Sequence, residues 1–235
     1  MISVIILAGG KGTRMKHDVA KQHLTIKNKQ IIEYTLSVFS KIERIDRIVV
    51  VSSKEYIDIV NSLKSKYPKL KIVCTGGETR SMSVFNGIKA IETDTKSEDL
   101  VLFSDAVRPC VTIKEINDLI DSLKHYSAVT TGLDCYETIL KTSDGFVKEI
   151  IDRKGLIRQT SPEGYKFDVL QKIYLDVSEE TIKKYKNIGI DQLIEQGYQI
   201  GVVHSNPLNF KITTQSDLKI FEAIVEKGFD DLYND

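Results

Sequence analysis

The sequence predicts an α/β fold: a doubly wound, mostly parallel, Rossmann-like sheet with helices on both faces. Continuous runs of β-branched residues, which are typical of strands buried on both faces, alternate with amphipathic helical periods. Polar segments that carry glycine or aspartate follow three of the expected strands. With 235 residues, the chain fits one domain, residues 1–235.

The first half of the chain contains the regular alternation. Four apolar runs are expected to form strands: Ser3–Leu7, Arg47–Val51, Lys71–Cys74 and Asp99–Phe103. Apolar residues recur at helical spacing between them, around residues 31–39, 56–63 and 84–91. Strand and helix alternation through residue 130 indicates right-handed βαβ units.

A different pattern begins near Leu133 and lasts to about Tyr165. Short strands are expected at Thr138–Leu140 and Val147–Ile151, around a turn, and a polar loop is expected at Asp152–Gly164. We interpret residues 133–165 as a small β-arm that protrudes from the main sheet. The expected elements after the arm are helices at Phe167–Tyr174 and Ile188–Glu195, strands at Ile200–Val203 and Asn209–Ile212, and a helix from Ser216 to about Val225.

The composition limits the partners. The 33 basic and 33 acidic side chains cancel, so no global field favours nucleic acid or an anionic membrane, and an anion site must be local. The apolar run at the start of the chain is too short to span a membrane. The three cysteines form no CxxC pair, which favours reduced thiols and a cytoplasmic protein.

The segment after the first strand is typical of a phosphate-binding loop. Three glycines, at positions 9, 10 and 12, let backbone N–H groups approach an anion closely, and Lys11, Arg14 and Lys21 add positive charge. A Walker A loop is excluded because Gly12 follows Lys11 where a Ser or Thr is required. A dinucleotide-binding loop is excluded because Met15 stands where its last glycine belongs.

Three polar segments, Ala8–Met15, Thr75–Arg80 and Ser104–Pro109, follow the ends of expected parallel strands. Ligands of doubly wound sheets bind beyond the carboxyl ends of the strands. We therefore expect the three segments to form one site.

Six ordered blocks of sequence resemble the IspD/TarI-type cytidylyltransferases, the family of methylerythritol-phosphate and ribitol-phosphate cytidylyltransferases. The blocks are LAGGKGTRM with AKQHL, GGETRSMSVFNGI, SDAVRP, the Asp152-Arg153 pair, the Gln159-Thr160 pair, and NFKITTQSDL. The resemblance covers nearly the whole chain. It implies a nucleotide-diphospho-sugar transferase-like fold and an enzyme that transfers CMP from CTP to a polyol phosphate and releases pyrophosphate.

The resemblance also assigns the nucleotide site. The matching catalytic cations are Arg14, Lys21 and Lys211, which would hold the phosphates and stabilise the charge that develops at the α-phosphorus. The matching nucleotide-binding residues are Ala8, Gly9, Gly10, Gly12, Gly76, Gly77, Arg80, Ser83, Asp105 and Ala106. Two alternatives stay open from the residues alone: Asp105 as a helix N-cap, and Lys21 and Lys211 as solvated surface lysines.

The acceptor and metal sites follow from the same resemblance. The residues that match acceptor-binding positions are Asp105, Arg108, Thr138, Arg153 and Thr160. Asp105 also matches the metal position, where one carboxylate suffices for Mg²⁺ bridging phosphates. Family arms exchange across a two-fold axis, which implies a homodimer in which Arg153 serves either its own or the neighbouring site.

Small differences between the two acceptor types favour ribitol 5-phosphate: LAGG, DAVRP and Leu208 before the NFK segment. The alternative acceptor is 2-C-methyl-D-erythritol 4-phosphate, used in isoprenoid precursor synthesis. Departures from the family pattern at Ser104, Ala20 and the Gln159–Glu163 run lie nearer the acceptor than the nucleotide. A different class, an inactive nucleotide-binding regulatory protein, is disfavoured because all three catalytic cations are present.

Overall fold

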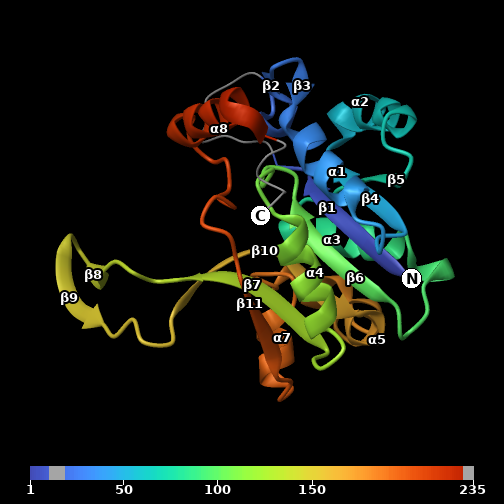
Figure 1. Ribbon diagram of the computed structural model, residues 1–235. Coiled ribbons are helices and arrows are strands. Elements are labelled where there is room, and N and C mark those ends of the chain that lie inside the picture. Colours follow the sequence, from blue (N-terminus) through green and yellow to red (C-terminus); the bar gives the residue numbers. More distant parts are fainter. Residues whose placement is uncertain (11–18, 230–235) are drawn as a thin grey trace.

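The computed structural model describes residues 1–10 and 19–229 and is built around a seven-stranded sheet (Figure 1). The strand order is β11-β7-β10-β6-β1-β4-β5, and β10 alone runs antiparallel to both of its neighbours among these described strands. The strands are β1 (Ile2–Ala8), β4 (Arg47–Ser52), β5 (Leu70–Thr75), β6 (Leu100–Asp105), β7 (Ala128–Asp134), β10 (Ile157–Lys166) and β11 (Ile200–His204). The doubly wound, mostly parallel sheet is thus confirmed.

Helices cover both faces of the sheet. The α-helices are α1 (Ile31–Lys41), α2 (Ile57–Ser62), α3 (Arg80–Lys89), α4 (Ile113–Ser122), α5 (Phe167–Leu170), α6 (Glu179–Lys183), α7 (Ile190–Glu195) and α8 (Gln215–Gly228). The 3₁₀ turns are η2 (Lys21–His23), η3 (Lys54–Tyr56), η4 (Leu63–Ser65) and η5 (Glu92–Asp94), and η6 (Gln171–Leu175) is a π-helical turn that continues α5. A small hairpin, β2 (Thr25–Ile26) with β3 (Lys29–Gln30), precedes α1.

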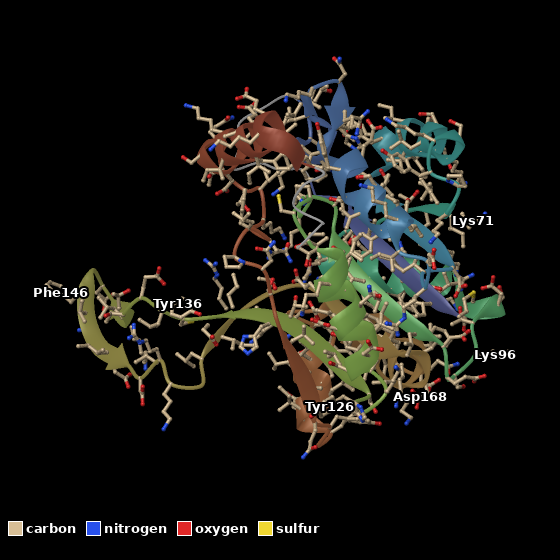
Figure 2. The ribbon with its side chains drawn as sticks, viewed as in Figure 1. Lys71, Lys96, Tyr126, Tyr136, Phe146 and Asp168 are labelled. Atoms are coloured by element: carbon tan, nitrogen blue, oxygen red, sulfur yellow. The ribbon has the colours of Figure 1, made fainter. Side chains whose placement is uncertain are left out.

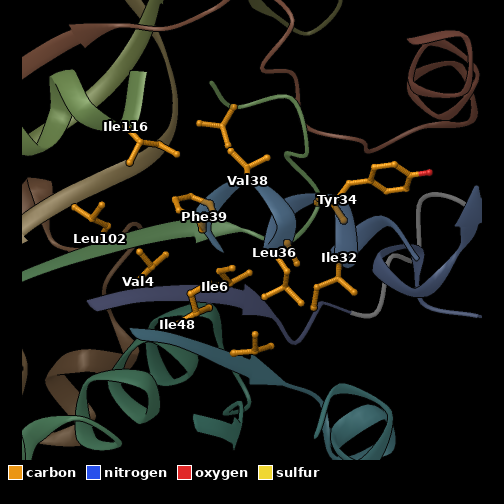
Figure 3. Packing of buried hydrophobic residues seen from close by; sticks show 14 of the residues in the cluster. Val4, Ile6, Ile32, Tyr34, Leu36, Val38, Phe39, Ile48, Leu102 and Ile116 are labelled. Atoms are coloured by element: carbon orange, nitrogen blue, oxygen red, sulfur yellow. The ribbon is translucent and has the colours of Figure 1, made fainter. Parts of the chain in front are cut away.

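Alternation along β1 divides the core into two layers. Val4 and Ile6 pack with α1, α4 and α8, while Ile5 packs with α3 on the opposite face. Figure 3 shows the first layer, in which Leu36 and Phe39 of α1 lie over the strands. Full burial of these large side chains gives a firm platform for the loops at the carboxyl ends of the strands.

Two parts of the sequence form structures other than those expected. The prediction of a polar loop at Asp152–Gly164 is wrong from Ile157 onward, because residues 157–164 form most of the long strand β10. Its polar residues are satisfied inside the sheet: Thr160 bonds Thr131, and Ser161 accepts a bond from the Asp105 amide. A search for alternating apolar and polar residues therefore misses a strand whose buried polar side chains are hydrogen-bonded to neighbouring strands.

The expected strand at Asn209–Ile212 is also not formed. The Asn209 side chain donates to the Ser161 carbonyl at 2.7 Å and to Glu115 Oε1 at 2.9 Å. Its own carbonyl accepts from Arg108 Nη1 at 2.8 Å. These bonds hold residues 209–213 as an irregular segment across the sheet rather than as a hydrogen-bonded strand. We call this segment the strap.

A hairpin of β8 (Ile139–Ser143) and β9 (Phe146–Ile151) stands away from the main sheet (Figure 1). Its turn uses Asp144 and Gly145, whose φ angles are +55° and +81°. A left-handed backbone of this kind is adopted readily by Asp and Gly. The hairpin lies within the range 133–165 that the sequence analysis interprets as an arm, but the predicted bounds are too wide, because residues 133–134 belong to β7 and residues 157–165 to β10 of the main sheet.

Candidate active site

A cavity of about 670 Å³ lies where the carboxyl ends of β1 and β6 meet the start of α3. The described parts of the three polar segments predicted to converge all contribute to its wall, and so do Lys211 and Thr213 of the strap after β11. The described residues that line it are Leu7, Ala8, Gly9, Gly10, Lys21, Gln22, Gly77, Glu78, Thr79, Arg80, Ser83, Asp105, Ala106, Val107, Lys211 and Thr213. Gly12 and Arg14, two of the predicted site residues, lie outside the described residues.

The two predicted catalytic lysines come from opposite ends of the chain and share this cavity. Lys21 in η2 is only 8% exposed, and its Nζ donates to the Ile212 carbonyl at 2.7 Å. The Ile212 amide in turn donates to the Val107 carbonyl at 3.0 Å, which fixes the strap beside the end of β6. The alternative of a solvated surface residue is therefore wrong for Lys21.

Asp105, the last residue of β6, forms the centre of a charged cluster. Its carboxylate lies 3.0 Å from Lys211 Nζ, 3.3 Å from Arg108 Nε and 3.9 Å from Arg80 Nη2. Burial opposes ionisation, but the attraction of Lys211, Arg80 and Arg108 prevails, and the pKa of Asp105 falls below its ordinary value. The carboxylate is thus ionised at neutral pH. No helix starts at Asp105, so the N-cap alternative is wrong.

The Gly76-Gly77 loop is tied to the first turn of α3. The Ser83 hydroxyl accepts from the Gly77 amide at 3.1 Å and donates to the Thr79 carbonyl at 3.0 Å, and Thr79 caps the helix. A side chain at position 77 would place its Cβ 2.4 Å from the Cβ of Met82, so only glycine permits this approach. Gly77 and Ser83 line the cavity, whereas Gly76 does not.

The predicted acceptor-binding residues are distributed differently. Among the described residues, Arg108 and Thr160 lie inside the protein rather than at the cavity wall: Arg108 braces Asp105 and Asn209, and Thr160 bonds Thr131 across the sheet. Thr138 and Arg153 are exposed and lie on the arm, where Arg153 donates to the Tyr136 carbonyl. Of the five residues, Asp105 alone lines this cavity.

Sequence reasoning assigned no role to six residues that line the cavity, namely Leu7, Gln22, Glu78, Thr79, Val107 and Thr213. All lie beside or within the blocks that carry the family resemblance. Position next to a predicted cation is a usable signal for Gln22, which follows Lys21 directly. Thr213 had no such signal, because its place depends on how the strap crosses the sheet.

Glu163 is a buried carboxyl close to the same cluster. It is 3% exposed and accepts a bond from the Tyr165 hydroxyl at 2.7 Å. Burial raises its pKa to about 6, although the Tyr165 hydroxyl and the charges of Arg80 and Arg108 favour ionisation; the nearby Asp105 carboxylate acts in the same direction as burial. The protein must therefore bury a charge at Glu163 above about pH 6.

We expect Glu163→Gln to stabilise the protein at pH 7.5 and to leave its stability near pH 4.5 unchanged. A folded-state pKa above the ordinary 4.5 means that the stability contributed by Glu163 is present below pH 4.5 and is lost as pH rises through about 6. The gain at pH 7.5 should be about 2 kcal/mol, at about 1.4 kcal/mol for each pH unit between the two values. Urea unfolding of both proteins at the two pH values measures it, and an equal difference at both would contradict the assignment.

No helix in residues 1–10 and 19–229 is long and apolar enough to cross a membrane. The same residues contain no cluster of three or more His, Cys, Asp or Glu side chains arranged to hold a metal ion.

A doubly wound sheet, a glycine loop after its first strand, and a cavity that brings Lys21, Lys211 and Asp105 together define the class: a nucleotidyltransferase. Residues 2–227 match the family model described as IspD, 2-C-methyl-D-erythritol 4-phosphate cytidylyltransferase. The chain belongs to the IspD family and is a CTP-dependent cytidylyltransferase.

Relatives and solved structures agree with this placement. The 2-C-methyl-D-erythritol 4-phosphate cytidylyltransferase of Clostridium botulinum (strain Okra / Type B1) is 36% identical over 96% of this chain and 97% of its own. That of Caldicellulosiruptor bescii is 34% identical over the same shares. The crystal structure of the Francisella tularensis enzyme, at 31% identity, superposes with a TM-score of 0.79 over 94% of this chain and 98% of that chain.

The crystal structure of 4-diphosphocytidyl-2C-methyl-D-erythritol synthase from Anaerococcus prevotii, at 29% identity, also superposes with a TM-score of 0.79, over 96% of each chain. These names correspond to the alternative acceptor of the sequence analysis. The comparisons therefore favour methylerythritol phosphate over ribitol 5-phosphate, which the sequence details had favoured.

Proposed function

We propose that this protein transfers CMP from CTP to 2-C-methyl-D-erythritol 4-phosphate and releases pyrophosphate. The observation that carries the proposal is the meeting of Lys21, Lys211 and Asp105 in one cavity beyond the strand ends, in a chain that matches the IspD family from residue 2 to 227. The names of the curated relatives support the acceptor. Substrate CTP and free thiols at Cys74, Cys110 and Cys135 favour the cytoplasm as its site of action.

The reaction needs charge and alignment more than it needs a base. An oxygen of the acceptor phosphate attacks the α-phosphorus of CTP, the new P–O bond forms, and the bond to the β-phosphate oxygen breaks with its electrons leaving on pyrophosphate. That attacking oxygen is already ionised at neutral pH. The two lysines supply positive charge where negative charge develops, and Arg14 matches a third such cation by resemblance.

The hydrogen bonds of the cluster keep these charges in place before the substrate arrives. Lys21 is bound to the strap through the Ile212 carbonyl, and Lys211, one residue earlier in the strap, is bound to Asp105. Because the groups are held by the folded protein, little reorganisation is needed when the charge develops. Both lysines thus depend on the same irregular segment.

The residues present fit a divalent cation. Asp105 is an ionised carboxylate on the cavity wall, and Mg²⁺ bound to phosphates usually takes only one or two protein carboxylates. Asp105 would hold the ion, which would supply further positive charge to the triphosphate. Asp105 also keeps Lys211 in place independently of any metal.

Pyrophosphate release tests the proposal. Purified protein with Mg²⁺ and CTP is incubated with 2-C-methyl-D-erythritol 4-phosphate, with ribitol 5-phosphate, and with no acceptor. We expect release with the first alone. Release with ribitol 5-phosphate instead would show that ribitol 5-phosphate is the acceptor. If neither acceptor causes release although CTP binds, the result would support the inactive regulatory alternative.

We also propose that the arm joins two subunits as a homodimer. A two-stranded hairpin is at best marginally stable alone, and this one exposes large apolar side chains. Phe146 is 69% and Ile150 71% exposed, and Leu140, paired with Ile150 across the hairpin, is 47% exposed. Figure 2 shows Phe146 on the outer part of the arm, far from the main sheet, and Tyr136 near the base of the arm. In such a dimer Thr138 and Arg153 would come near the partner's cavity.

We expect Ile150→Lys to weaken dimerisation at least about tenfold, because a charge would be buried in an apolar contact. Light scattering over a dilution series measures the dissociation constant. Ile59→Lys replaces another exposed isoleucine, 42% exposed on α2, and serves as the control that should remain dimeric. A dimer unaffected by Ile150→Lys would place the interface elsewhere.

A further inference from the structure

Gln22 has no part in the proposed chemistry, although it lines the cavity and is only 2% exposed. Its Nε2 donates to the Ala8 carbonyl at 2.6 Å and to the Gly10 carbonyl at 3.1 Å. A side-chain amide nitrogen carries two N–H groups, so both are used by carbonyls on either side of Gly9.

The hydrogen bond from Gln22 to the Ala8 carbonyl fixes the orientation of the peptide between Ala8 and Gly9, where the glycine loop starts. Ala8 is the last residue of β1 in register with β4, so the chain leaves the sheet there and its carbonyl needs a partner outside the ladder. In a trans peptide, the carbonyl and the following N–H point in opposite directions. Binding the Ala8 carbonyl to Gln22 therefore turns the Gly9 amide away from Gln22.

Gln22 is itself held firmly from both sides. Its predecessor Lys21 is bound to the Ile212 carbonyl, and its successor His23 stacks on the Tyr56 ring with a centroid distance of 4.1 Å. A buried side chain on so constrained a turn loses little further freedom when it binds the loop. Gln22 thus acts as a fixed clamp rather than as a mobile surface amide.

Carbonyl oxygens repel phosphate, whereas backbone N–H groups attract it. We infer that Gln22 is a positioning residue for the triphosphate of CTP: by binding the carbonyls of Ala8 and Gly10, it keeps them from the β- and γ-phosphates and fixes the loop that receives those phosphates. This inference rests on the proposed function, since it requires CTP to bind in this cavity. The clamp should therefore strengthen binding of the β- and γ-phosphates and have little effect on binding of the cytidine monophosphate part of CTP.

Titration calorimetry of CTP and CMP tests the clamp. Gln22→Met keeps the size of the buried side chain and removes both donors. We expect its dissociation constant for CTP to rise about ten- to a hundredfold, as the loss of two hydrogen bonds predicts, while that for CMP changes by less than about twofold. Gln22→Leu, which also removes both donors and adds no charge, should show the same selective loss for CTP.

Tyr34→Phe is the matched control. It removes a buried bond from a side chain to a carbonyl, that of Tyr34 Oη to Ile26, without touching the cavity, and should bind CTP as the wild type does. Unchanged CTP affinity in both Gln22 variants, or equal weakening of CTP and CMP, would overturn the inference while the pyrophosphate assay stays positive. A wild-type protein that binds no CTP would remove the proposed function as well.

Discussion

Replacing Lys21 by methionine should lower kcat about a hundred- to a thousandfold, the usual effect of removing one preorganised charge from a transition state. Methionine fills a similar volume but carries no charge toward the α-phosphorus. The measurement is steady-state pyrophosphate release at saturating CTP and acceptor. Because Lys21 is bound inside the cavity before substrate arrives, we expect the loss mainly in kcat rather than in KM.

Lys27→Met provides the matched control for this prediction. Lys27 Nζ also donates to a backbone carbonyl, that of Val225 at 3.0 Å, but does not line the cavity. Its substitution should leave kcat within about twofold of the wild type. If Lys21→Met folds with normal cooperativity and retains full turnover, Lys21 has no catalytic role and the proposed arrangement of cations is wrong.

The sequence predicted those helices and strands whose apolar residues follow one regular pattern. Strand β4 has a continuous apolar interior from Ile48 to Val51, and helix α1 has its apolar residues at helical spacing, so both could be predicted from the sequence pattern. Strand β10 was missed because its polar residues are satisfied by neighbours distant in sequence, such as Thr131. A polar strand in the centre of a sheet is only possible with such partners, and the partners are a property of the fold.

The same distinction applies to the site. Loops that follow strands had to meet at one edge of the sheet, so the contributions of Gly9, Gly77 and Asp105 could be expected from order alone. The resemblance added Lys211, 106 positions after Asp105 in the chain. It did not reveal that Arg108 turns inward, because that orientation depends on the Asn209 carbonyl that the strap brings to it.

Replacing Asp105 by asparagine should also lower kcat by about a hundredfold. Asparagine keeps the size and loses the charge that lies 3.0 Å from Lys211 and 3.3 Å from Arg108. Lys211 would then no longer be held toward the reacting phosphorus by an ion pair. Asp99→Asn is the matched control: Asp99 is a similarly buried carboxylate with a lowered pKa, paired with the amino terminus outside the cavity. It should lose stability without losing turnover.

A double-mutant cycle with Lys211→Met separates two ways in which Asp105 could act. If Asp105 acts chiefly by holding Lys211, the double variant should be little worse than either single variant, because each change removes the same interaction. If Asp105 acts independently, for example through a metal, the two losses should multiply. The 3.0 Å ion pair between the two side chains leads us to expect the first result. Losses that multiply would show that this contact is structurally present but catalytically unimportant.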